Sequence, residues 1–119
     1  MNSMDVNKAI AESTGWTNIA PSQFYNGRLM GDPCGLASAR TTTPDYWNDG
    51  NQIRSAIEYG LRSYLERLNF ENELRTIINR DHKDEEDYRG ANVFLYVTAT
   101  AYQLCEAFLG AKGLWTENK

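Results

Sequence analysis

The side chains best suited to bind a ligand lie in and around residues 44–51, Pro-Asp-Tyr-Trp-Asn-Asp-Gly-Asn. This segment leads into a predicted helix, and the unpaired amides and dipole at a helix N-terminus attract anions such as phosphate. Aromatic rings stack on nucleobases, and an arginine guanidinium pairs with phosphate. The candidate ligand-binding residues are Tyr46, Trp47, Asn51 and Arg54, with Arg28 or Arg40 supplied by a loop.

The same segment also has a purely structural interpretation. Pro44 favours an extended approach to the helix, Tyr46 packs against the core, and Asp49 caps the first free amides. A carboxylate cap disfavours an anion at the same place, because it already occupies the amide donors. Both interpretations stay open from the sequence.

Acidic residues are the second group whose spacing suits chemistry. Asp45 and Asp49 form one pair and Glu71 and Glu73 another, but paired carboxylates act as acid and base only where one is buried. We expect these groups to be solvated, so a small hydrolase that uses paired acids is a third, less favoured function. The loop over residues 80–90 carries the densest negative charge and is a candidate surface for a basic partner. Its candidate partner-binding residues are Asp81, Asp84, Glu85, Glu86 and Asp87.

The chain offers little else for catalysis or metal binding. His82 is the only histidine, so a transition-metal site is not expected. Cys34 and Cys105 are the only cysteines; Cys105 falls on an apolar helix stripe and is expected in the core, while their distance in space stays open. No phosphate-binding loop or nucleophile-elbow motif occurs. The sequence predicts a protein that is not an enzyme and uses no metal or cofactor.

The composition is that of one globular domain over residues 1–119. The chain has a mass of 13.5 kDa, with 41% hydrophobic and 24% charged residues. A net charge of −4 argues against binding to duplex nucleic acid or to an anionic membrane. The longest apolar run, Val93–Val97, is too short to span a bilayer, and the first residues do not resemble a signal peptide. We expect a soluble, intracellular protein.

Three amphipathic helices are predicted from apolar residues that recur every three to four positions. They cover residues 4–14, 50–68 and 100–112. Thr100 and Gln103 fit a capping box at the start of the last helix.

Strands are predicted at residues 23–31, 70–79 and 91–97, with a loop over residues 36–44. Residues 70–79 also fit one face of a helix, although we favour the strand. Together the elements predict a mixed α+β fold. The expected architecture is a small α/β/α sandwich with three helices around an antiparallel sheet of about three strands, and two layers are the alternative.

Several segments together resemble the phage ABA sandwich domain family, small proteins encoded by bacteriophages and prophages. The similarity spans most of the chain and rests on a first helix that ends in Gly15-Trp16, on Gly31-Asp32-Pro33, on residues 44–51 entering a helix, and on an alanine-rich last helix. The resemblance implies an α/β/α sandwich and a phage origin. It implies no established activity.

The aromatic content points to an interface. The chain contains 7 Tyr, 3 Trp and 4 Phe, more than a core of this size needs, so some should be exposed for a partner or a homo-oligomer. With the phage resemblance, the first hypothesis is a non-catalytic phage accessory binding protein in the host cytoplasm. It would counter bacterial defence by binding a host defence protein or by sequestering a nucleotide immune signal. The alternative is a structural or assembly accessory of the phage particle.

Overall fold

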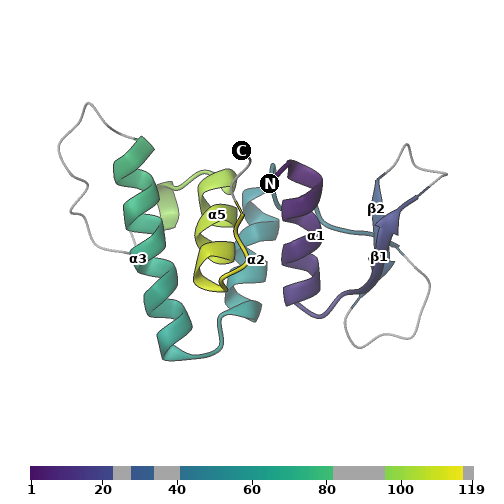
Figure 1. The fold of residues 1–119 in the computed structure, drawn as a ribbon, viewed down its shortest axis with the longest axis horizontal. Coiled ribbons are helices and arrows are strands. Elements are labelled where there is room, and N and C mark those ends of the chain that lie inside the picture. The colour runs from purple at the N-terminus through teal and green to yellow at the C-terminus, as the bar shows by residue number, and fades with distance from the viewer. Residues whose placement is uncertain (23–27, 34–40, 82–95, 117–119) are drawn as a thin grey trace.

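The computed structural model describes residues 1–22, 28–33, 41–81 and 96–116 (Figure 1). The mixed α+β class and the antiparallel three-stranded sheet predicted from the sequence are confirmed. Residues 96–98 add a short helical turn before the last helix. The elements are α1 (Ser3–Ser13), β1 (Thr17–Pro21), β2 (Leu29–Asp32), β3 (Thr41–Thr42), α2 (Gly50–Gly60), α3 (Tyr64–Asp81) and α5 (Ala101–Ala111).

The core is built around α5. Seven consecutive residues of this helix, Gln103 to Leu109, are buried, because α5 packs against α3, α2 and α1. A helix that is apolar on nearly all sides belongs in a protein interior. Its largest buried side chain is Phe108. The capping box between Thr100 and Gln103 is present, as predicted.

The sheet lies at one end of the molecule, beside α1, and the described helices lie on the same side of it (Figure 1). This order of layers differs from the predicted sandwich, in which helices surround the sheet. The physical reason is that residues 70–79 do not form a strand of the sheet. Their apolar side chains pack into the core between the helices instead. The sheet itself supplies one buried hydrophobic side chain, Leu29.

The strand order is β1-β2-β3, with both pairs antiparallel. Ala20 pairs with Met30, and the register shifts between Thr17 and Ala20. Asn18, within this irregular stretch, has φ 55° and donates from its side-chain amide to Asp32 Oδ2 at 2.8 Å. The irregularity is therefore stabilised by a side-chain hydrogen bond across the strand pair.

The predicted strand at residues 70–79 is wrong, because these residues belong to α3. Phe70, Leu74, Ile77 and Ile78 are all buried on one side of the helix, against α5. Their spacing of four, three and one positions is helical. The same segment alternates polar and apolar residues, so local pattern did not distinguish the two forms, and packing against α5 decides for the helix.

The single helix predicted over residues 50–68 is in fact two helices. α2 ends at Gly60, and Ser63 Oγ accepts a hydrogen bond from the amide of Glu66 at 3.1 Å, which caps the start of α3. The break changes the direction of the chain. Side chains that would have continued the buried face of one helix are now exposed: Tyr64, Leu65 and Leu68.

The other strand predictions are partly tested. Residues 29–31 are extended, as predicted, while residues 23–27 and 91–95 lie outside the described residues. Tyr96 and Val97 were predicted to be extended but are helical, so that prediction is wrong. The chain also forms β1 and β3, which the sequence patterns did not predict; β3 lies inside the predicted loop.

Candidate functional site

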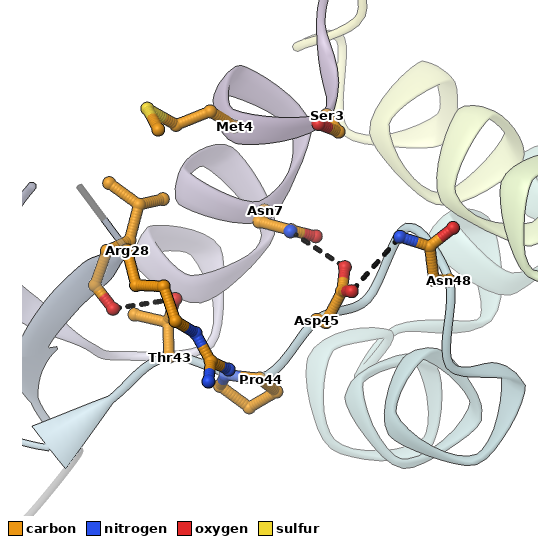
Figure 2. Close-up of a pocket in the computed structure, with 9 residues that line it drawn as sticks. Ser3, Met4, Asn7, Arg28, Thr43, Pro44, Asp45 and Asn48 are labelled. Atoms are coloured by element: carbon orange, nitrogen blue, oxygen red, sulfur yellow. Dashed lines mark hydrogen bonds between the residues drawn. The ribbon is translucent and has the colours of Figure 1, made fainter. Parts of the chain in front are cut away.

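A polar pocket lies where α1 meets the sheet and the segment that enters α2. Its volume is about 250 Å³, and Figure 2 shows side chains from all three parts of the fold around it. We call it the α1 pocket. It is lined by Ser3, Met4, Asn7, Arg28, Leu29, Thr43, Pro44, Asp45 and Asn48.

Asn7 fixes this segment against α1. Its side-chain amide donates to Asp45 Oδ1 at 3.1 Å, and its carbonyl oxygen accepts from the backbone amide of Trp47 at 2.9 Å. On the other side, the Asn48 amide donates to Asp45 Oδ2 at 3.0 Å. Each oxygen of the Asp45 carboxylate is therefore held by an amide, as the dashed lines in Figure 2 show.

Asp45 is a hydrogen-bond acceptor at neutral pH. Partial burial alone would raise the pKa of its carboxyl, but hydrogen bonds from Asn48 and Asn7, and the positive charge of Arg28, hold it below the ordinary 3.8. A carboxyl with a lowered pKa is a poor proton donor or general base near pH 7. The site therefore offers Asp45 as a fixed negative charge.

Arg28 supplies the positive charge of the pocket. Arg54, Arg62 and Arg67 each donate to a backbone carbonyl, and Arg80 donates to carboxylates. The Arg28 guanidinium, by contrast, donates no hydrogen bond to the described residues and is exposed. Its donors are available to a ligand, and a guanidinium binds phosphate or carboxylate through two parallel hydrogen bonds.

The α1 pocket is lined mainly by hydroxyl, amide and charged side chains. The α1 pocket contains hydroxyls from Ser3 and Thr43, but no histidine or cysteine that would form a nucleophile–base pair. Within the described residues, no group of three histidine, cysteine or acidic side chains is placed to hold a metal ion.

Of the predicted ligand-binding residues, Tyr46 is part of the core. Its exposed fraction is 4%, and burial raises the pKa of its hydroxyl. The Cys105 thiol donates to the Tyr46 carbonyl oxygen at 3.1 Å. The Tyr46 ring is therefore not available to stack on a base, as the structural interpretation of the segment expects.

Trp47 and Arg54 also have partners within the protein. Trp47 is half-buried and makes an edge contact with Tyr102, with ring centroids 4.7 Å apart. Arg54 donates to the carbonyl oxygens of Tyr96, Val97 and Ala99 at 3.2–3.3 Å. This arginine thus satisfies the carbonyls around the helical turn at 96–98.

The predicted set does not form one site. Asn51 is exposed at the start of α2, where its backbone amide donates to the Asp49 carboxylate. Arg40 lies outside the described residues. Only Arg28 lines the α1 pocket. The Asp-x-x-Asn spacing of residues 45–48 was a usable signal for a side-chain turn. Asn7 carried no such signal, because it lies 38 residues from Asp45 in sequence.

The predicted acidic partner surface is described only at its start. Asp81 ends α3, where it accepts from Arg80 Nε at 3.0 Å and from the Gln103 amide at 3.0 Å. Its carboxylate therefore ties α3 to α5. The other predicted acidic residues, Asp84, Glu85, Glu86 and Asp87, lie outside the described residues, as do His82 and Cys34.

Cys105 is in the core, as predicted. It is fully buried, and burial, followed by the negative charge of Asp45, raises the pKa of its thiol to about 12. A thiol with such a pKa carries almost no thiolate at neutral pH and is a poor nucleophile.

Among the described residues, no helix combines the length and the apolar character that crossing a membrane requires. The chain was also compared with protein-family models, with curated proteins and with solved structures, and none of these comparisons found a match.

Proposed function

We propose that the chain is a non-catalytic binding protein that takes a small anionic ligand into the α1 pocket. In the phage setting that the family resemblance implies, it acts in the host cytoplasm as a counter-defence inhibitor. The ligand is then a nucleotide immune signal, which the protein sequesters without cleaving it.

The observation that carries this proposal is the Arg28 guanidinium at the pocket. Its donors face no hydrogen-bond acceptor among the described residues, although other arginines of the chain donate to carbonyls or carboxylates. A phosphate would provide that acceptor, and Ser3 supplies a hydroxyl at the same pocket, whereas the Thr43 hydroxyl donates to the carbonyl oxygen of Leu29. The lowered pKa of Asp45 supports binding without acid–base chemistry.

The test is isothermal titration of the protein with nucleoside monophosphates and cyclic dinucleotides. We expect binding that Arg28→Gln weakens about tenfold, since hydrogen bonds to charged groups are worth roughly 1.5–3 kcal/mol. Lys8→Gln is the control, because it removes an exposed positive charge of α1 that does not line the pocket. Heating the complex should release the ligand intact. The proposal fails if the protein binds none of these nucleotides, or if it returns them hydrolysed.

A second candidate function, binding of a host defence protein, is favoured by an exposed apolar patch at the start of α3. Tyr64 is 81% exposed and Leu65 64%, and Leu68 lies one turn further on. Exposed aromatic and aliphatic clusters are typical of interfaces. A stable complex with a purified defence protein, lost in Tyr64→Ser/Leu65→Ser, would support it.

The same patch bears on the predicted homo-oligomer. Size-exclusion chromatography with light scattering should show dimers whose fraction rises with protein concentration, and the double variant should lack them. A monomer at every concentration would contradict self-association. Detection of the protein in purified phage particles would instead favour the structural or assembly alternative.

A further inference from the structure

We infer that the α1 pocket recognises one guanine nucleotide unit, with Asp45 accepting hydrogen bonds from the guanine and Arg28 binding the phosphate. This inference rests on the proposed function and names the ligand class of the same pocket. It follows from the pairing of one fixed anion and one available cation across a small polar cavity.

The carboxylate of Asp45 selects among nucleobases by its two acceptor oxygens. Guanine presents two neighbouring donors, N1–H and the exocyclic amino group, which match a carboxylate. Adenine and cytosine place an amino donor beside a ring-nitrogen acceptor, and uracil places its N–H between two carbonyl oxygens. These edges would face Asp45 with at least one acceptor, which repels a carboxylate.

Asp45 is held in place before any ligand arrives. Asn7 and Asn48 each donate one hydrogen bond to a different oxygen of the carboxylate, at 3.1 Å and 3.0 Å. The backbone amide of Asn48 also interacts with this carboxylate, and the acceptor positions that remain on its two oxygens are open to a ligand. Asn7 is in turn anchored by the amide of Trp47, so that the acceptor pair is fixed to α1. Such preorganisation lowers the entropy that binding must overcome.

The small size of the pocket favours a ligand of one unit. Its volume of about 250 Å³ is below the roughly 300–1,000 Å³ of sites for drug-sized molecules. Met4, Leu29 and Pro44 supply apolar surface beside the polar groups, as Figure 2 shows for Met4 and Pro44. A base can therefore contact both apolar and polar lining, while its phosphate reaches the exposed guanidinium of Arg28.

The decisive experiment is calorimetric titration of the unmodified protein with GMP, IMP, AMP and inorganic phosphate. IMP keeps the N1–H but lacks the exocyclic amino group, so we expect it to bind about tenfold more weakly than GMP. AMP should bind no better than phosphate. This series needs no variant, so a folding defect cannot imitate the result.

Variants assign the two roles. Asp45→Asn should remove the preference for GMP over AMP while phosphate binding is retained, and Arg28→Gln should weaken all four ligands. Asp49→Asn is the matched control, because it removes the same charge four residues away, outside the pocket, and asparagine caps a helix as well as aspartate. Circular-dichroism melting checks that each variant is folded.

The outcomes separate the two proposals. Equal binding of GMP, IMP and AMP, with loss in Arg28→Gln, overturns the guanine inference and leaves anion binding in place. Retained preference for GMP in Asp45→Asn also overturns it. If neither the nucleotides nor phosphate bind the unmodified protein, both the inference and the proposed function fail.

Discussion

The ring of Phe108 lies so close to Gly60 that a Cβ on this glycine would be 2.9 Å from the ring Cζ. Phe108 is fully buried in α5, and Gly60 is the last residue of α2. Real Cβ atoms almost never approach a carbon so closely, so with a larger residue the Phe108 ring or one of the helices must shift. The glycine therefore sets the distance between α2 and the central helix.

Gly60→Ala should lower the free energy of unfolding by about 1–3 kcal/mol, the usual cost of overpacking a core. Urea unfolding measures the change. Gly110→Ala is the matched control: the three atoms nearest to its Cβ would all belong to the exposed side chain of Glu73, the first of them a carboxylate oxygen 3.0 Å away. That variant should be as stable as the unmodified protein or more so, since alanine favours a helix. Equal stability of Gly60→Ala and Gly110→Ala would contradict the close packing.

The buried carboxylate of Glu106 depends on Arg80. Arg80 Nη1 donates to Glu106 Oε2 at 2.9 Å, and the side chain of Glu106 is only 9% exposed. Arg80→Met leaves this carboxylate with the Tyr102 hydroxyl, 3.3 Å away, as its remaining described donor. We expect the free energy of unfolding to fall by about 1–3 kcal/mol.

A double-mutant cycle separates loss of the pair from loss of the arginine stem. Glu106→Gln in the Arg80→Met background should restore part of the stability, because a neutral amide is less costly to bury than an unpaired carboxylate. Strictly additive losses would show that the two groups are not coupled.

The Asp45 carboxyl should make stability depend on pH in the acid range. Its pKa is lower in the folded protein than the ordinary 3.8, so its contribution is present above about pH 4 and is lost as pH falls through the folded pKa. Because the group is exposed, screening by solvent keeps the effect small. Urea unfolding from pH 2.5 to 6 should show the advantage over Asp45→Asn shrinking toward low pH. An advantage that is the same at every pH would contradict the hydrogen-bonded carboxylate.

Cys105 should resist thiol reagents until the protein unfolds. It is fully buried, and the pKa of its thiol is raised to about 12. In a Cys34→Ser variant, iodoacetamide should therefore modify Cys105 only at the rate of unfolding, which mass spectrometry follows over time. Fast modification of folded protein would show that the core around this thiol opens.

Secondary structure could be predicted from the sequence where a local pattern fits one element only. The capping box of Thr100 and Gln103 depends on four consecutive residues, so the sequence alone predicts it, and the structure contains it. Residues 70–79 satisfied two periodicities at once, and only contact with α5 decided between them. The break after Gly60 was missed because the apolar repeat runs on into Tyr64, Leu65 and Leu68, which the structure exposes.

The candidate site was less predictable, because it joins distant segments. The chemistry of its side chain predicts Arg28 as a ligand-binding residue, and Arg28 lines the pocket. The same reasoning predicts Tyr46 and Arg54, but Tyr46 is buried in the core and Arg54 donates to the carbonyl oxygens of Tyr96 and Ala99. The hydrogen bond from Asn7 to Asp45 depends on tertiary structure, because the two residues lie 38 positions apart. Local sequence patterns do not predict such a pair.

The thin sheet at the end of the molecule has a consequence for how the protein opens. With Leu29 as its one buried hydrophobic side chain, it should exchange its amide hydrogens at a lower opening free energy than α5. The α1 pocket is lined by Arg28 and Leu29 on the sheet side and by Asn7 on the helix side. A bound ligand would link the sheet to α1. The protection of the Met30 and Thr42 amides from hydrogen exchange should then rise, while the protection of α5 stays unchanged. Ligand binding in the α1 pocket would therefore raise the local stability of the sheet.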